Sequence, residues 1–292
     1  MADKKMNLPI KHTPGSNASI GIFDSGVGGL SVLRAIRERL PNENIIYLAD
    51  QAHVPYGPRS LGEVLAFSES ITDFLLDEGC KLVMVACNTA SAAALICLRE
   101  IFPHVPFIGM EPAVKPAAET TQSGVVGVLA TPATFQGALY ASVVERFAQG
   151  VRILQDTCPG LVAQIEAGSL AGVETRAILE SALGPMLAEG IDTIVLGCTH
   201  YPFVIPVIEE ISGPNVRVID PAPAIARQME RVLAGKGLLN EGKKTGISRK
   251  PTFYTTGQAS QLSQMLPALL GEAGTVSELE WVAGKLVKKP AR

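Results

Sequence analysis

The sequence predicts an α/β protein built from two pseudo-symmetric, doubly wound domains with mostly parallel sheets. Short apolar runs recur along the chain between amphipathic helical patterns, and several of these runs lack in/out alternation. Such runs are typical of parallel strands that are covered by helices on both faces. The chain also twice shows a strand that leads into a polar turn, followed later by a strand that ends in a cysteine. Strand–helix alternation of this kind favours a doubly wound architecture.

Seven apolar runs are predicted to be strands: Ser19–Phe23, Ile45–Ala49, Leu82–Ala86, Pro106–Gly109, Val125–Ala130, Thr193–Gly197 and Val216–Ile219. An amphipathic helix is predicted over Leu30–Leu40, where Arg34, Arg37 and Arg39 form a polar face. Pro41 ends this helix.

Two pairs of strand ends indicate an internal duplication. Ile22-Phe23-Asp24 and Val128-Leu129-Ala130 both lead into polar turns, and Cys87 and Cys198 each end a later strand. Asp24 precedes Cys87 by 63 residues, and Ala130 precedes Cys198 by 68. Because ligands bind outside the carboxyl ends of strands in open α/β sheets, we expect both cysteines on opposite walls of one interdomain cleft.

The composition excludes several classes of protein. The 292 residues are 47% hydrophobic and 18% charged, which excludes a disordered chain. The net charge is −3, so no global field recruits nucleic acid or an anionic membrane. The uncharged stretch 82–98 is predicted to be a buried strand running into a buried helix rather than a membrane span.

Two polar segments are predicted to lie outside the folded elements. Residues 1–18 contain Lys and Pro but no apolar signal core, which predicts a disordered leader on a cytoplasmic protein. The basic stretch 236–250 is Gly-rich and is interpreted as a solvated loop rather than a nucleic-acid patch.

The five cysteines are odd in number and contain no C-x-x-C pair, which argues against a disulfide framework or a four-cysteine zinc site. Cys80 and Cys97 lie in apolar helical patterns and are interpreted as core, whereas Cys158 lies in a loop and is open to either interpretation. Cys87 and Cys198 each follow a strand directly. We expect each at the N-terminal end of the next helix, where the helix dipole lowers a thiol pKa.

His200 lies two residues after Cys198 and has several possible roles: a packed histidine, a zinc ligand, the base of a nucleophile or an acid that assists a thiol. A zinc site needs three or four ligands, and only Cys87, Cys198 and His200 are available. A cysteine hydrolase needs one thiol and leaves the second unused. Two facing thiols fit a two-base reaction at one carbon better.

The glycine-rich turn Gly26-Val27-Gly28-Gly29 follows the first predicted strand, as in dinucleotide-binding proteins. Ser31 replaces the third glycine, however, and the Asp24 carboxylate would repel a pyrophosphate. A turn whose N–H groups face a single carboxylate is the better interpretation.

Asp24-Ser25, Pro55-Tyr56-Gly57 and Thr131 are either ordinary caps and turns or groups that hold the carboxylates of a small amino acid. Neither their spacing nor their residue types decide between these interpretations.

Together these motifs resemble the bacterial glutamate racemases of the cofactor-independent aspartate/glutamate racemase superfamily. The matching segments cover about residues 19–223: Ile22–Leu30, Tyr47–Asp50, Pro55–Gly57, Ala86–Ala90 and Gly197–Pro202. The resemblance implies a first domain of residues 19–115 and 222–292, a second of 116–221, and an active site between them.

The resemblance also implies the site residues. Cys87 and Cys198 would be the acid and base, assisted by Asp24, Glu166 and His200. Substrate contacts carried over by position, with Thr131 added from its strand end, are Asp24, Ser25, Tyr56, Gly57, Asn88, Thr89, Thr199 and His200.

The activity implied is cofactor-independent and metal-free interconversion of L- and D-glutamate by a homodimer that supplies D-glutamate for peptidoglycan. Racemisation of aspartate or another acidic amino acid, and a catalytically silent amino-acid-binding protein, are the alternatives.

Overall fold

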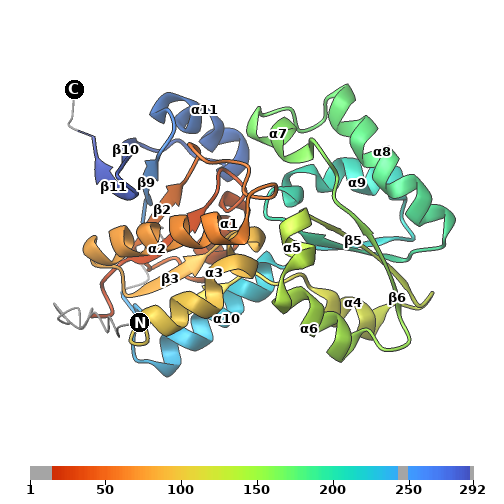
Figure 1. Cartoon of the computed structure of the whole chain (residues 1–292), viewed down its shortest axis with the longest axis horizontal. Coiled ribbons are helices and arrows are strands. Elements are labelled where there is room, and N and C mark those ends of the chain that lie inside the picture. The colour runs from red at the N-terminus through yellow and green to blue at the C-terminus, as the bar shows by residue number, and fades with distance from the viewer. Residues whose placement is uncertain (1–14, 243–248, 290–292) are drawn as a thin grey trace.

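The computed structural model describes residues 15–242 and 249–289, which form two α/β lobes side by side (Figure 1). The sheet of the first lobe has the strand order β11-β10-β9-β2-β1-β3-β4 and is parallel except where β10 meets β11. Its strands are β1 (Ile20–Asp24), β2 (Ile45–Ala49), β3 (Leu82–Val85), β4 (Phe107–Gly109), β9 (Thr252–Thr255), β10 (Val276–Val282) and β11 (Lys285–Lys288).

The sheet of the second lobe is wholly parallel and has the order β6-β5-β7-β8. Its strands are β5 (Val125–Ala130), β6 (Arg152–Asp156), β7 (Thr193–Gly197) and β8 (Arg217–Ile219). This order repeats that of β2-β1-β3-β4 in the first lobe, element for element. The predicted pair of pseudo-symmetric, mostly parallel α/β units is therefore confirmed.

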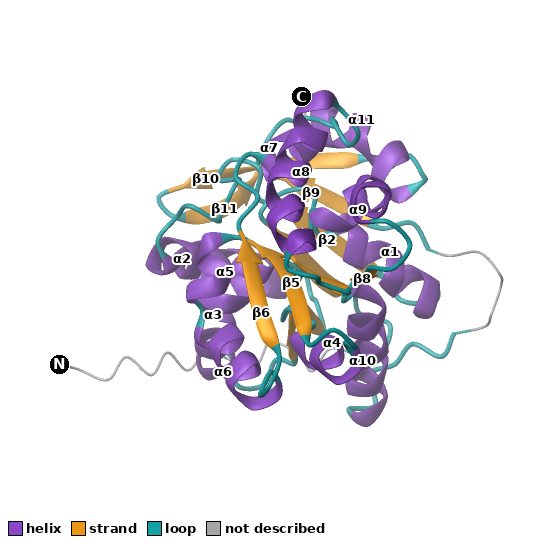
Figure 2. Ribbon diagram, turned by 90° about the vertical axis from the view of Figure 1, so that its right-hand side faces the viewer, coloured by secondary structure: helices purple, strands orange, loops and turns teal. Residues whose placement is uncertain are grey.

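Helices cover both faces of each sheet (Figures 1 and 2). In the first lobe, α2 and α3 pack on one face, and α1, α10 and α11 on the other. In the second lobe, α4 and α6 face α7, α8 and α9 across the sheet. The helices are α1 (Leu30–Arg39), α2 (Leu61–Asp77), α3 (Asn88–Ile101), α4 (Val114–Thr120), α5 (Pro132–Gln136), α6 (Ala138–Phe147), α7 (Leu161–Glu166), α8 (Val173–Ala188), α9 (Ile205–Ser212), α10 (Ala222–Gly235) and α11 (Ala259–Leu270), with a 3₁₀ turn η1 (Tyr201–Val204).

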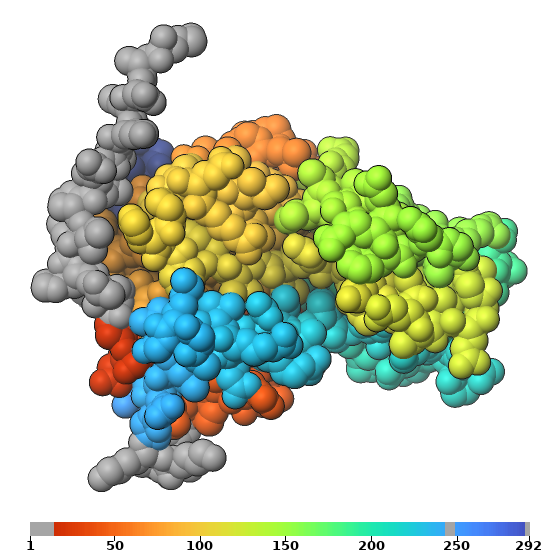
Figure 3. Space-filling view, turned by 90° about the horizontal axis from the view of Figure 1, so that it is seen from below, coloured from red at the N-terminus to blue at the C-terminus, as the bar shows by residue number. Residues whose placement is uncertain are grey.

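The chain returns to the first lobe after β8. Helix α10 packs against α1, and β9 then pairs with β2 at the sheet centre. Figure 3 shows α10 in blue beneath the first lobe, with the green second lobe beside it. The predicted domain boundaries at residues 115/116 and 221/222 remain a prediction.

The uncharged stretch 82–98 forms β3 and most of α3, as predicted. No helix in the described ranges combines the length and apolar character that a membrane span requires. The predicted leader falls largely on residues 1–14, and part of the basic stretch falls on 243–248. Both of these segments lie outside the described residues.

The sequence did not predict β6, β9, β10 or β11. In β6, Arg152-Ile153-Leu154-Gln155-Asp156, polar residues flank only two apolar ones, because this edge strand is half-exposed. Strands β10 and β11 are also partly exposed and mix Glu, Ser and Lys with apolar residues. Strand β9 is interior and mostly buried, but only two of its four residues, Phe253 and Tyr254, are apolar. Strands buried on both faces are conspicuous when their apolar run is unbroken, as in β3 and β7.

Candidate active site

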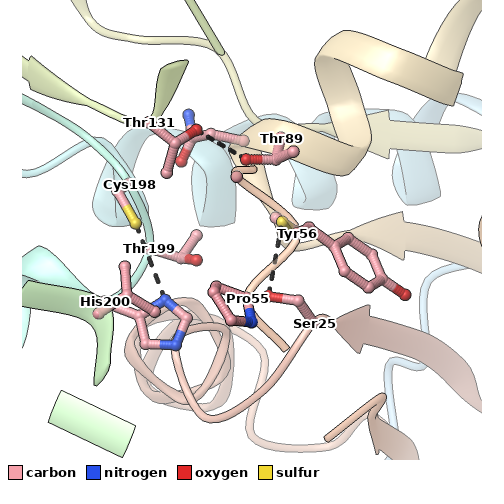
Figure 4. Close-up of a pocket in the computed structure, with 12 residues that line it drawn as sticks. Ser25, Pro55, Tyr56, Thr89, Thr131, Cys198, Thr199 and His200 are labelled. Atoms are coloured by element: carbon pink, nitrogen blue, oxygen red, sulfur yellow. Dashed lines mark hydrogen bonds between the residues drawn. The ribbon is translucent and has the colours of Figure 1, made fainter. Parts of the chain in front are cut away.

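One pocket lies at the carboxyl ends of strands from both lobes (Figure 4). It holds about 260 Å³ of space free of atoms, part of it open to solvent. The lining residues are Ser25, Pro55, Tyr56, Gly57, Cys87, Asn88, Thr89, Thr131, Val162, Cys198, Thr199 and His200. Ten of these are predicted site residues. Pro55 belongs to a motif that the sequence analysis singled out without giving it a role of its own, and Val162 was not singled out.

Four equivalent strand ends deliver the central groups. Ser25 follows β1 and Cys87 follows β3 in the first lobe, while Thr131 follows β5 and Cys198 follows β7 in the second. The two cysteines thus reach one pocket from different sheets. Ligands in open α/β folds bind at this edge of the sheet because the parallel strands end there together.

Cys87 is the N-cap residue of α3. Its Sγ accepts a hydrogen bond from the Ala90 N–H at 3.4 Å and lies 4.0 Å from Ser25 Oγ. The expected net lowering of this pKa is wrong, although the helix does act in that direction through the Ala90 N–H. Burial of the thiol, reinforced by the negative charge of Asp24, raises the pKa of Cys87 despite the hydrogen bond from Ala90. Cys87 is therefore held as a neutral thiol.

Cys198 lies in a turn rather than at a helix N-terminus, because η1 begins only at Tyr201. Its Sγ lies 3.7 Å from His200 Nδ1 (Figure 4), and the other ring nitrogen lies 2.6 Å from Glu166 Oε1. Burial alone would lower the pKa of His200. The hydrogen bonds to Cys198 and Glu166 outweigh it and raise that pKa well above its usual range. His200 is therefore an imidazolium beside the Cys198 sulfur.

Glu166 does not line the pocket but supports His200 from behind. Its Oε1 also accepts the backbone N–H of Val27 at 2.7 Å, from the turn between β1 and α1. Burial would raise the pKa of Glu166, but the hydrogen bonds and charge of His200 dominate and lower it. The carboxylate stays ionised and joins the second lobe to the first.

Asp24 is fully buried and also lies behind the lining. Its Oδ1 accepts from Gly26 N–H at 2.8 Å, and its Oδ2 accepts from Thr199 Oγ1 at 3.0 Å. Burial raises its pKa, although the positive charge of His200 opposes this. Asp24 reaches the pocket through Thr199, and its predicted role remains a prediction.

Asn88 has an unusual environment for a buried amide. It is 2% exposed, and within residues 15–242 and 249–289 neither its Nδ2 nor its Oδ1 has a hydrogen-bond partner. An unpaired buried polar group costs about 1–3 kcal/mol, so such an atom in a pocket points to a ligand that pairs with it. Beside it, Thr89 Oγ1 and Thr131 Oγ1 lie 2.7 Å apart and join α3 to the loop after β5.

The glycine-rich turn does face a carboxylate, but one that belongs to the protein. A Cβ on Gly26 would lie 1.9 Å from Glu166 Oε1, and one on Gly28 would lie 2.5 Å from His200 Nδ1. The turn therefore needs glycine because the second lobe packs directly onto it.

The other cysteines lie outside the lining. Cys80 is buried in the core between α2 and β3, and Cys97 is half-buried on α3. Cys158 is buried with a backbone φ of 44°, and its N–H donates to Asp156. Val162, which the sequence interpretation missed, lies one helical turn before Glu166 on α7. That spacing was the available signal.

Comparison with known proteins agrees with this geometry. The family model described as Asp/Glu/Hydantoin racemase matches residues 20–229. The chain is 50% identical over 263 residues to a glutamate racemase of Pseudomonas aeruginosa (strain PAO1), which covers 90% of this chain and 98% of the relative. A glutamate racemase of Stutzerimonas stutzeri (strain A1501) is 49% identical, covering 89% and 96%.

Solved structures give the same result. A glutamate racemase from Bacillus anthracis superposes with a TM-score of 0.80 at 33% identity, covering 91% of this chain and 98% of the other. One from Escherichia coli, in complex with L-glutamate and the activator UDP-MurNAc-ala, has a TM-score of 0.78 at 31% identity, covering 90% and 98%. The chain thus belongs to the Asp/Glu/Hydantoin racemase family.

Proposed function

We propose that this amino-acid racemase interconverts L- and D-glutamate without a cofactor, by proton transfer between the substrate α-carbon and two cysteines. The observation that carries the proposal is that Cys87 and Cys198 line one pocket from two different sheets. Inversion at a carbon needs a base on one face and an acid on the other, with the roles exchanged in the reverse direction.

The proposed roles in one direction follow from the surroundings of the two sulfurs. His200, supported by Glu166, lies beside the Cys198 sulfur, and we infer that Cys198 acts as the base on L-glutamate. Burial raises the pKa of Cys87, which suits the acid. The Cys198 thiolate takes the α-proton of L-glutamate, and the Cys87 S–H delivers its proton to the opposite face. After D-glutamate dissociates, Cys87 is a thiolate and Cys198 is a thiol. This is the form of the enzyme that acts on D-glutamate in the reverse direction.

The carbanion formed between these steps needs stabilisation at the α-carboxylate. The unpaired amide of Asn88 and the hydroxyls of Thr89 and Thr199 line the pocket and supply hydrogen-bond donors. Donors fixed where charge develops are worth more in a water-poor site than in water. Ser25, Tyr56, Gly57 and Thr131 complete the proposed substrate contacts.

Glutamate as the substrate is supported by the relatives. Proteins of 49–50% identity carry the name glutamate racemase, and the related Escherichia coli and Francisella tularensis structures hold L-glutamate and D-glutamate. By the resemblance to bacterial glutamate racemases, we further propose a cytoplasmic homodimer whose D-glutamate is used for peptidoglycan.

The test is to incubate the purified protein with L-glutamate in heavy water, with no added cofactor. We expect the circular dichroism of the substrate to decay to zero while deuterium enters the α-position. L-Aspartate is assayed in parallel. Racemisation of aspartate but not glutamate would overturn the substrate, and no exchange on either would overturn the reaction.

The two-thiol scheme is tested separately by Cys87→Ser and Cys198→Ser. Each variant is expected to lose about 10²- to 10⁴-fold in turnover in both directions, the usual contribution of an acid–base group. Cys97→Ser, on the same helix as Cys87 but outside the pocket, is the matched control and keeps its activity. Near-normal turnover by Cys87→Ser would refute the scheme.

A further inference from the structure

Besides Asp24, a second buried carboxylate, Asp50, lies directly behind the pocket and makes four side-chain contacts. It follows β2 and is fully buried. Oδ2 accepts from the Tyr56 hydroxyl at 2.6 Å and lies 2.9 Å from His53 Nδ1. Oδ1 accepts from Thr256 Oγ1 at 2.7 Å and from the indole N–H of Trp281 at 2.8 Å. With both oxygens engaged, this carboxylate has one favoured orientation.

Tyr56 connects Asp50 to the pocket. Its ring is 1% exposed and lines the pocket, and its hydroxyl points away from the pocket to Asp50. Burial, reinforced by the charge of Asp50, raises the pKa of Tyr56 well above its usual range, so the phenol remains a donor. The position of the ring in the pocket therefore depends on where Asp50 is held.

Trp281 connects Asp50 to the C-terminal end of the chain. It lies on β10, beyond residues 20–229 that the family model matches. Its ring packs against Phe67 at 5.6 Å and His53 at 5.1 Å between centroids, and His53 stacks on Phe67 at 3.9 Å. The C-terminal hairpin thus reaches the loop that carries Tyr56 through an aromatic cluster and one hydrogen bond.

We propose that Trp281 is a positioning residue for the active site: its indole N–H, with the hydroxyl of Thr256, orients Asp50, and Asp50 fixes the pocket-lining ring of Tyr56. Trp281 touches neither sulfur nor the pocket. Its loss therefore weakens the fit of the substrate rather than proton transfer. The kinetic consequence rests on the proposed function, whereas the coupling between Trp281 and Tyr56 does not.

The kinetic test uses Trp281→Phe and Thr256→Val, which each remove one donor to Asp50 and keep most of the side-chain volume. We expect the KM for L-glutamate to rise about three- to tenfold, while kcat stays within about twofold of the wild-type value. The reason is that the lost hydrogen bond is to the charged Asp50, which contacts the pocket only through Tyr56. In a Tyr56→Phe background, Trp281→Phe should raise KM no further.

The matched control is Tyr254→Phe on β9, the strand next to β10. It removes a hydroxyl that donates to Glu78 at the end of α2 rather than to Asp50. It should leave both constants unchanged. A Trp281→Phe variant that melts earlier but keeps a normal KM would overturn the proposal, since Trp281 would then only stabilise the hairpin. An equal KM increase in the Tyr56→Phe background would also overturn it.

A second measurement needs no substrate, because Trp281 is the only tryptophan in the sequence. Its fluorescence is compared in the wild-type protein, Tyr56→Phe and Tyr254→Phe. We expect Tyr56→Phe alone to red-shift the emission and raise quenching by acrylamide, because Asp50 loses a donor and the cluster loosens. Unchanged emission and quenching in Tyr56→Phe would refute the coupling even if the wild-type protein racemised no glutamate at all.

Discussion

The charge of His200 depends on two neighbours, Glu166 and Cys198. Glu166 accepts from one ring nitrogen at 2.6 Å, and the Cys198 sulfur lies 3.7 Å from the other. The pKa of His200 is raised, so its contribution to stability is fully present below about 6.5 and is lost as pH rises through the raised value. The pKa of Glu166 is lowered, so its contribution is fully present above about 4.5 and is lost as pH falls through the lowered value. The pair stabilises the fold fully between these two limits.

Glu166→Gln removes the charge that holds the His200 proton. We expect the pKa of His200 to fall and the alkaline limb of the pH profile for racemisation to move to lower pH. Nitrogen-15 NMR of the imidazole, with His200→Asn to assign the signal, gives the titration directly. Identical His200 titrations in the wild-type protein and Glu166→Gln would show that Glu166 does not control this proton.

At the scale of elements, the turn from β1 to α1 is one place where the two lobes pack closely together. Its glycines let Glu166 of α7 and the loop after β7 pack against backbone, and Ser31 of α1 donates to the Thr199 carbonyl at 2.9 Å. The atom nearest a Cβ on Gly26 is the end of a flexible side chain. A substitution there is therefore relieved by moving Glu166 rather than by unfolding.

Gly26→Ala is accordingly expected to lower racemisation at least tenfold, because Glu166 must leave His200, while the melting temperature changes little. Gly62→Ala is the control, since a Cβ there meets nothing within 4 Å and lies in the first turn of α2. It should keep full activity and stabilise the protein by up to about 1 kcal/mol. Equal activity in the two variants would mean that the contact between Glu166 and the turn has no catalytic role.

The sequence predicted most of the elements that build the pocket. The predicted helix Leu30–Leu40 is α1 with Leu40 as its C-cap, and the strands before Cys87 and Cys198 lie within a residue of their predicted ends. Each of these strands is fully buried, so its apolar run is unbroken. Trp281 was not singled out, because its strand is partly exposed and mixes Ser and Glu with apolar residues, so no unbroken apolar run marks it.

The sequence also could not predict the surroundings of the two cysteines. Spacing placed two cysteines at equivalent strand ends, but it could not show that Cys87 is buried next to Asp24 or that Cys198 lies beside an imidazolium. The two similar motifs have different environments because Asp24, at the end of β1, lies near Cys87, whereas Glu166 of α7 supports His200 beside Cys198. Such tertiary contacts have no local signature.

At the scale of the whole molecule, the pocket lies at the seam between two lobes, which share apolar packing and are also joined by polar contacts beside the pocket. Thr89 meets Thr131, Asp24 meets Thr199, and Val27 meets Glu166. Each contact joins the first lobe to the second at the edge of the pocket. A ligand that fills the pocket adds contacts to both lobes at once, so ligand binding and closure of the seam are thermodynamically linked.

This linkage is measurable in Cys87→Ser, which we expect to bind glutamate and to convert it only slowly during the measurement. With D-glutamate at 100 times its dissociation constant, we expect the free energy of unfolding to rise by about 2.7 kcal/mol. Hydrogen exchange should slow on both sides of the seam, at the start of α3 and in the turn after Thr131. Adding Asn88→Ala should weaken this response while raising the stability of the unliganded protein, since it removes a buried amide with no partner. Protection confined to one lobe would show that glutamate is held by that lobe alone, and the two sulfurs would then lack a common substrate.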